Sequence, residues 1–209
     1  VCLSKDVPPV AEWLKDLAGS ALRYPLEKMK LARKFTVSGD VNWKTYGDNY
    51  AEAWHVPTIH PGLNASIDMA GYKIETVGDS LQIHSAPAKD GGITDGLWVW
   101  KMPGLFVNMY NWGMNVAQLE PLGPRKMRLT YRYLLTDMDA IAAKVRDELI
   151  DWGYMIAKED LEICAQVQAN LEAGIYDTGR LSLVFENGVI QFQDMVRAAY
   201  REATSIAAE

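Results

Sequence analysis

The chain has 209 residues, of which 49% are hydrophobic and 23% charged, the proportions of an ordinary globular protein rather than of a disordered or fibrous one. Its 27 acidic and 21 basic side chains leave a formal charge of −6, and no run of Lys or Arg exceeds two residues, so we expect no nucleic-acid partner. The longest uncharged stretch, from Met102 to Glu120, contains proline, glycine and asparagine, so we expect no membrane span.

The first third of the chain predicts short elements. Helical spacing predicts a helix over Val10–Leu17, and the following apolar run predicts a strand over Met29–Val37. A helix is expected from Asn42 to about His55, where Pro57 ends it. From there through Ala70 we expect a loop.

Strands dominate the middle of the chain and helices its end. Six short alternating or β-rich runs, separated by turn residues, predict an antiparallel meander: Tyr72–Val77, Leu81–His84, Leu97–Met102, Leu105–Tyr110, Met114–Leu119 and Met127–Leu135. Helical spacing follows in Ala140–Ile156, Leu161–Leu171 and Val189–Ala203. This order predicts an α+β fold, a curved antiparallel sheet packed against long C-terminal helices.

Two of the three histidines, His55 and His60, lie five positions apart directly after Glu52. On a helix, Asp48, Glu52 and His55 would share one face, opposite an aromatic face of Trp43, Tyr46, Tyr50 and Trp54. A five-residue step separates two helical side chains by about 140°, so both histidines reach one metal ion only if the helix breaks between them, as a proline there predicts. Alternatively, the acidic face is simply solvated.

The acidic pair Glu159-Asp160, which is expected to open a helix, offers the best third ligand. Asp160 shares a stripe with Cys164, Val167 and Leu171, whereas Glu159 lies on a mostly polar stripe, so Asp160 should point inward. Two imidazoles and one carboxylate form a facial triad that leaves positions for dioxygen and substrate, and a metal ion would neutralise the buried carboxylate. The alternative is that Asp160 caps the helix N-terminus.

Other metal-binding side chains are interpreted as structural. His84 has no carboxylate or histidine close to it in sequence, and Cys164 is expected to be an unreactive buried thiol. With Cys2, the two cysteines are too few for a disulfide framework or a cysteine cluster, which favours a reducing, cytoplasmic location. The chain opens without methionine or a signal peptide, so we expect an upstream part. No linker or repeat divides residues 1–209, which should form one domain.

The run from Asn42 to Pro61, with Asn-Trp-Lys, Asp-Asn-Tyr, Glu52, His55 and His60-Pro, resembles the iron-binding signature of Rieske non-haem iron oxygenases. Later segments are similar to further landmarks of the catalytic domain, so the resemblance covers essentially the whole chain: 119–125, 159–160, 167–168, 179–182 and 186–192. It implies a helix-grip fold.

The resemblance also implies roles. His55, His60 and Asp160 would hold a mononuclear Fe(II), Glu52 would link a neighbouring subunit's Rieske cluster to His55, and Asp48 would lie beside the ligands. The family usually forms a homotrimer, in which electrons pass from NAD(P)H through a separate flavin and iron–sulfur reductase to the [2Fe-2S] cluster of one subunit and the iron of the next.

One family feature is absent from the sequence. Neither Cys-x-His nor Cys-x-x-His, the motifs that hold the Rieske [2Fe-2S] cluster, occurs in the 209 residues. The chain therefore resembles the catalytic half alone, a mononuclear iron domain over residues 1–209. The Rieske domain is expected upstream.

The substrate expectation also comes from the resemblance. The Asp-Asn-Tyr-x-Glu-x-x-His arrangement, with Glu52 in the bridging position, looks like the quaternary-ammonium group of oxygenases, which act on choline, carnitine, glycine betaine or stachydrine. This implies hydroxylation of an N-methyl group and release of formaldehyde. Aromatic rings attract such cations, and the candidates expected to line the cavity are Trp98, Trp100, Tyr110 and Trp112, although the first two could equally be core residues.

Three alternatives stay open. An aromatic-ring dioxygenase or an O-demethylase would use the same scaffold and the same ligands. A non-catalytic helix-grip module would hold a small hydrophobic ligand, with the histidines as structural residues. A zinc hydrolase would use the same three ligands, although no further residue is obviously placed as its general base.

Overall fold

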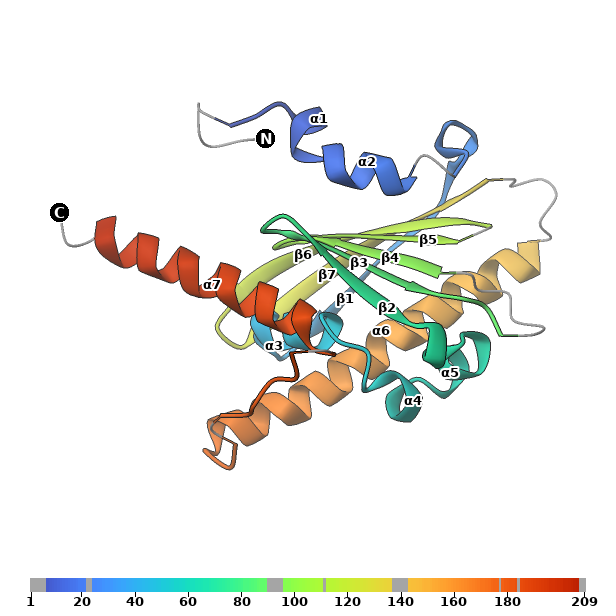
Figure 1. Ribbon diagram of the computed structural model, residues 1–209. Coiled ribbons are helices and arrows are strands. Elements are labelled where there is room, and N and C mark those ends of the chain that lie inside the picture. Colours follow the sequence, from blue (N-terminus) through green and yellow to red (C-terminus); the bar gives the residue numbers. More distant parts are fainter. Residues whose placement is uncertain are drawn as a thin grey trace.

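The structure is a computed structural model, and it describes residues 7–21, 24–89, 96–110, 112–136, 143–176, 178–183 and 185–206. Cys2 and the predicted helix start at Ala140 lie outside these ranges. Seven strands form one antiparallel sheet in the order β1-β7-β6-β5-β4-β3-β2 (Figure 1). Their bounds are β1 (Lys30–Gly39), β2 (Lys73–Val77), β3 (Leu81–Ala86), β4 (Gly96–Lys101), β5 (Leu105–Tyr110), β6 (Gly113–Gly123) and β7 (Lys126–Leu135).

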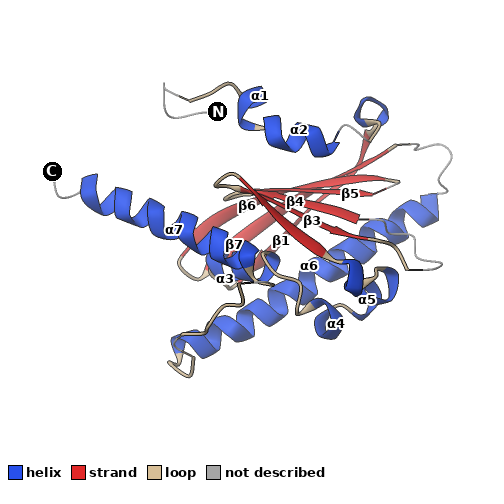
Figure 2. Cartoon of the chain, viewed as in Figure 1, coloured by secondary structure: helices blue, strands red, loops and turns tan. Residues whose placement is uncertain are grey.

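Helices lie on both sides of the sheet (Figure 2). The short helices α1 (Val10–Trp13) and α2 (Lys15–Ala21) lie beside one face. Along the other face run α3 (Trp43–Tyr50) and the long helix α6 (Ala143–Glu172), with the start of α7 (Asn187–Ile206) near them. The predicted α+β fold is confirmed.

Strand alternation explains which face carries the main core. In β7, every second residue is buried, namely Met127, Leu129, Tyr131, Tyr133 and Leu135. Side chains of a strand point alternately to the two faces, so this row lies on one face, where it packs with residues of α3, α6 and α7. A second apolar cluster on β3, β4 and β5 includes Leu17 of α2 and therefore belongs to the opposite face.

Several expected helices differ from the structure. The helix expected over Val10–Leu17 is divided at Leu14 into α1 and α2. The segments Ala140–Ile156 and Leu161–Leu171 were expected as separate helices, but α6 is continuous from residue 143 to residue 172, because the polar residues between them form helix readily. The helix expected to reach His55 ends at Tyr50.

The predicted loop before Ala70 instead contains α4 (Val56–Ile59), α5 (Pro61–Ser66) and a 3₁₀ turn over Met69–Gly71. Prolines occupy the first turns of α4 and α5, where a missing N–H costs no hydrogen bond. A further 3₁₀ turn covers Leu26–Lys28. In the part of the chain that the structure describes, no helix combines the length and apolarity needed to cross a bilayer.

Candidate metal centre

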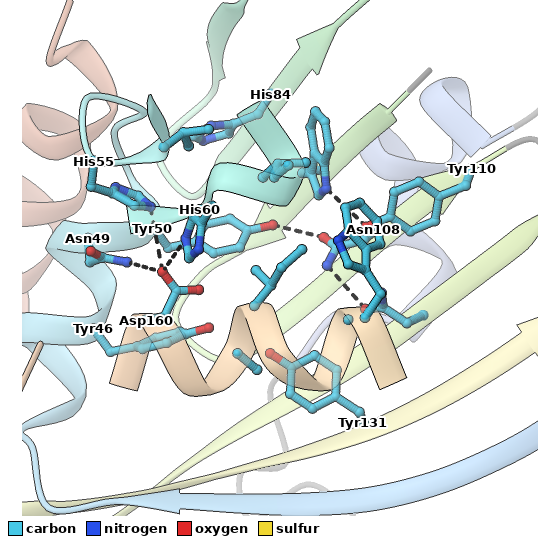
Figure 3. A pocket seen from close by; sticks show the side chains of 18 of the residues that line it. Tyr46, Asn49, Tyr50, His55, His60, His84, Asn108, Tyr110, Tyr131 and Asp160 are labelled. Atoms are coloured by element: carbon cyan, nitrogen blue, oxygen red, sulfur yellow. Dashed lines mark hydrogen bonds and ion pairs between the residues drawn. The ribbon is translucent and has the colours of Figure 1, made fainter. Parts of the chain in front are cut away.

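His55, His60 and Asp160 converge at one end of the space between the sheet and α6 (Figure 3). His55 stands at the start of α4, His60 lies between α4 and α5, and Asp160 projects from the middle of α6. Each offers one ligand atom, and these atoms all lie within 4.8 Å of one another. The prediction that Asp160 points inward holds, and its position inside α6 excludes the helix-cap alternative.

The donor set fits a metal ion. The Asp160 Oδ1 atom lies 3.0 Å from His60 Nε2 and 3.5 Å from His55 Nε2, and the two imidazole rings meet edge to face with centroids 5.0 Å apart. Two donors at right angles on one ion, each about 2.1 Å from it, would lie about 3.0 Å apart. Three such donors on one side leave the other side free for further ligands.

The remaining ring nitrogens are held by carboxylates. His60 Nδ1 lies 2.7 Å from Glu159 Oε2, and His55 Nδ1 is bonded to Glu52. A carboxylate that accepts the Nδ1 proton leaves the Nε2 lone pair for a metal ion and fixes the ring orientation. Sequence reasoning missed Glu159, because the polar stripe to which it was assigned also faces the loop that carries His60.

Asp160 has a further partner, since Asn49 Nδ2 donates to its Oδ1 at 2.7 Å. His60 is only 2% exposed and Asp160 8%, whereas Asn49 is partly buried. Asp48, expected beside the ligands, accepts instead from Gln193 Nε2 of α7 at 3.1 Å, and burial raises its pKa.

Electrostatics couple His60 to its two carboxylates. Burial alone would lower the pKa of His60, but its hydrogen bonds and attraction to Asp160 and Glu159 outweigh that and raise the pKa above the usual 6.5. A proton on His60 competes with a metal ion for the same nitrogen. Cys164, one turn beyond Asp160, is buried with its thiol pKa raised, first by burial and then by Asp160, which agrees with the interpretation as an unreactive thiol.

A cavity of about 100 Å³ extends from these residues along the sheet. Its floor is a row of cross-strand neighbours, one from each of the five strands β3 to β7: His84, Trp98, Asn108, Asn115 and Tyr133. Residues directly opposite each other in an antiparallel sheet share a face, which places this row in one line.

Polar contacts tie the floor together. The Tyr50 hydroxyl donates to Asn108 Oδ1 at 2.9 Å, and Asn108 Nδ2 donates to Asn115 Oδ1 at 3.1 Å. Trp98 Nε1 donates to the Tyr110 hydroxyl at 3.1 Å. These amides and hydroxyls therefore bond one another beneath the cavity.

Of the four aromatic residues expected at the cavity, Trp98, Tyr110 and Trp112 line it, and Trp100 is absent from the lining. Trp100 is fully buried, with its ring centroid 5.2 Å from that of Phe106 and 4.8 Å from that of Phe192. It lies two residues along β4 from Trp98, beneath α3, where Gly47 allows close approach: a Cβ there would meet the Trp100 ring at 2.9 Å. The core alternative holds for Trp100.

Comparison with known proteins decides the family. The family described as the ring hydroxylating alpha subunit (catalytic domain) matches residues 26–202. The chain belongs to this family. The catalytic-domain resemblance and the helix-grip architecture expected from the sequence are thereby confirmed, since the domain is a sheet gripping α6.

This ring-hydroxylating catalytic domain is 31% identical over 165 residues to the chloroplastic choline monooxygenase of Arabidopsis thaliana, a match that covers 73% of the chain and 37% of that protein. It is 27% identical to the carnitine monooxygenase oxygenase subunit of Acinetobacter baumannii, over 93% of the chain and 56% of that protein. A solved structure of a quaternary ammonium Rieske monooxygenase superposes with a TM-score of 0.79 at 25% identity, covering 95% of the chain and 58% of the other. The chain thus spans about a third to just over half of these proteins.

Proposed function

We propose that the chain is the iron-bearing catalytic domain of a Rieske-type monooxygenase that hydroxylates an N-methyl group of a quaternary ammonium compound. The convergence of His55, His60 and Asp160 beside an aromatic cavity carries the proposal. Relatives named choline and carnitine monooxygenases support the substrate class.

In this proposal, His55, His60 and Asp160 hold Fe(II), and Glu52 and Glu159 keep the two imidazole rings oriented toward it. Bound Fe(II) supplies the activation of O2 for C–H hydroxylation, after which the hemiaminal product collapses to an amine and formaldehyde. The aromatic rings that line the cavity, among them Trp98, Tyr110 and Trp112, hold the cation, each suitable ring contributing about 0.5–2 kcal/mol.

The two electrons that this reaction needs come, in this proposal, from NAD(P)H through a flavin and iron–sulfur reductase and a Rieske [2Fe-2S] cluster outside the 209 residues. Glu52 is the natural link, because one of its oxygens bonds His55 Nδ1 while its side chain stays partly exposed. The exposed Trp54 lies two residues further on, and its backbone N–H donates to the other Glu52 oxygen. We place the neighbouring subunit of a cytoplasmic homotrimer against this surface.

A product assay tests the proposal. The complete oxygenase and a reductase, given O2, NADH and a panel of N-methylated cations, should release formaldehyde and the demethylated amine. A cis-diol or phenol from an aromatic substrate would instead support a ring dioxygenase or O-demethylase, activities that share the scaffold. Glu52→Gln should lower the product formed per bound iron, a ratio that corrects for any loss of metal. Glu75→Gln, which removes the same charge from an exposed position, should leave that ratio unchanged, since of the two residues only Glu52 bonds a proposed ligand.

Metal analysis separates this proposal from the remaining alternatives. Purified under argon, the chain should bind about one Fe(II), as a facial triad requires. A native chain that takes up no metal would support the ligand-binding module. A chain that hydrolyses esters or amides with zinc and has no oxygenase activity would support the hydrolase.

A further inference from the structure

A chain of hydrogen bonds runs from the cavity wall to α7 through Tyr72, His84 and Gln82. The Tyr72 hydroxyl lies 2.9 Å from His84 Nδ1, and His84 Nε2 lies 3.3 Å from Gln82 Oε1. Gln82 Nε2 in turn donates to the backbone carbonyl of Gly188 at 2.5 Å. Gln82 and His84 are buried and Tyr72 is partly buried, and Tyr72 and His84 both line the cavity.

The Gly188 end of this hydrogen-bonded series determines which group donates at each step. A backbone carbonyl only accepts, so Gln82 presents its NH2 group to Gly188 and its oxygen to His84. His84 Nε2 must then carry the imidazole proton, which leaves Nδ1 as an acceptor. Burial, and to a lesser extent His55, lower the pKa of His84 to about 3, so the ring is neutral near pH 7.

Tyr72 is therefore committed as a donor to His84. Its proton lies on the hydrogen bond to His84, and the oxygen lone pairs that remain can only accept a hydrogen bond. A ligand hydroxyl is a suitable donor for this oxygen. A ligand carboxylate has no proton to donate, so its oxygens would be repelled by the lone pairs of the Tyr72 oxygen.

The charge on the cavity lining also disfavours a ligand carboxylate. The carboxylates Glu52 and Asp160 line the cavity, and the described lining contains no lysine or arginine. A buried carboxylate without a cationic partner is strongly disfavoured, whereas a cation is stabilised by nearby carboxylates and aromatic rings.

We propose that Tyr72, held as an acceptor by His84 and Gln82, makes the cavity select N-methylated cations whose longest arm ends in a neutral hydroxyl over those whose arm ends in a carboxylate. This inference rests on the proposed function, and it narrows the substrate class of the same site to choline-like compounds.

Calorimetric titration of the Fe(II)-loaded chain under argon tests it with three ligands that share the trimethylammonium group: choline, ethyltrimethylammonium and glycine betaine. A net hydrogen bond of ordinary strength should make choline bind about 2- to 10-fold more tightly than ethyltrimethylammonium, which lacks the hydroxyl. Glycine betaine should bind more weakly than both.

Tyr72→Phe should remove the preference for choline over ethyltrimethylammonium and leave the affinity for ethyltrimethylammonium unchanged. Tyr154→Phe, which deletes a hydroxyl outside the cavity lining, is the matched control and should keep the preference.

The outcomes separate the two proposals. If none of the three cations binds, the proposed function fails. If they bind but glycine betaine binds as tightly as choline, or choline no better than ethyltrimethylammonium, the inference about Tyr72 is overturned while the proposed function stands. The comparison of ligands on the unaltered chain decides this even if Tyr72→Phe does not fold.

Discussion

The two ends of the cavity are built in different ways. The metal end takes its groups from residues 49–60 and from one adjacent pair on α6, whereas the sheet floor takes one residue from each of five strands. The metal end is an ionic cluster, and the floor consists of neutral aromatic and amide side chains. Substitutions at one end should therefore change metal binding, and those at the other should change stability or ligand choice with the metal retained.

Removal of a ligand should have the largest effect. His60→Ala deletes a buried imidazole that contacts both Asp160 and Glu159. Loss of an outer partner of a ligand costs about 10- to 100-fold in metal affinity, so loss of the ligand itself should cost more than about 100-fold. Iron per chain, measured by atomic emission, should fall close to zero. A variant that keeps its iron contradicts the site, and His84→Gln on the floor should retain it.

Glu159→Gln tests the residue that sequence reasoning missed. Glutamine keeps the shape but loses the charge that holds His60 Nδ1, so Fe(II) affinity should fall by about 10- to 100-fold. Glu162→Gln removes the same charge from an exposed position on α6 and is the matched control. Competition with a fluorescent chelator measures both, and equal affinities would show that Glu159 does not orient His60.

Gly153→Ala should affect the floor and spare the metal. A Cβ at Gly153 of α6 would lie 1.9 Å from the Tyr133 hydroxyl oxygen, so the helix or the ring must move. Overpacking of this kind costs about 1–3 kcal/mol in the free energy of unfolding, measurable with urea. Adding Tyr133→Phe removes the nearest atom and should recover part of the loss, because the next contact is at 3.0 Å. Unchanged stability in Gly153→Ala would contradict this packing.

Within any one pH unit, the smallest effect is a pH dependence at the floor. Burial lowers the pKa of His84 to about 3. As the pH falls below 6.5, His84 therefore becomes protonated in the unfolded chain while it stays neutral in the folded chain. His84 should thus reduce the free energy of unfolding by up to about 1.4 kcal/mol for each pH unit between 6.5 and 3. His84→Gln should show a slope smaller by one proton in urea titrations at several pH values. Parallel slopes would mean that His84 is protonated in the folded chain.

The convergence of His55, His60 and Asp160 could be predicted because each of the two segments carries a local sequence signal. His55 and His60 are close in sequence, a proline marks the break between them, and the apolar stripe through Cys164 sets the direction of Asp160. Glu159 was not predicted because it lies on the polar stripe of the helix. That stripe does not show that the loop carrying its partner His60, 99 residues away in sequence, packs against it.

The floor could be predicted only as far as the strands themselves. Trp98 and Trp100 point to the same face of β4, so alternation cannot tell which faces the cavity. The register of five strands and the position of α3 over Trp100 decide that, and both are long-range properties. The continuity of α6 was not predicted, because a polar turn inside a long helix has the same sequence pattern as the start of a new helix.

The carboxylates around the two imidazoles have a consequence for charge balance. Glu52, Glu159 and Asp160 bring three formal negative charges to two neutral rings. A divalent ion compensates two of them and leaves one uncompensated in a largely buried place. A monovalent cation in the neighbouring cavity would bring the sum to zero, so the carboxylates can accommodate both cations. Because the two cations carry the same sign, each reduces the electrostatic attraction that the carboxylates exert on the other.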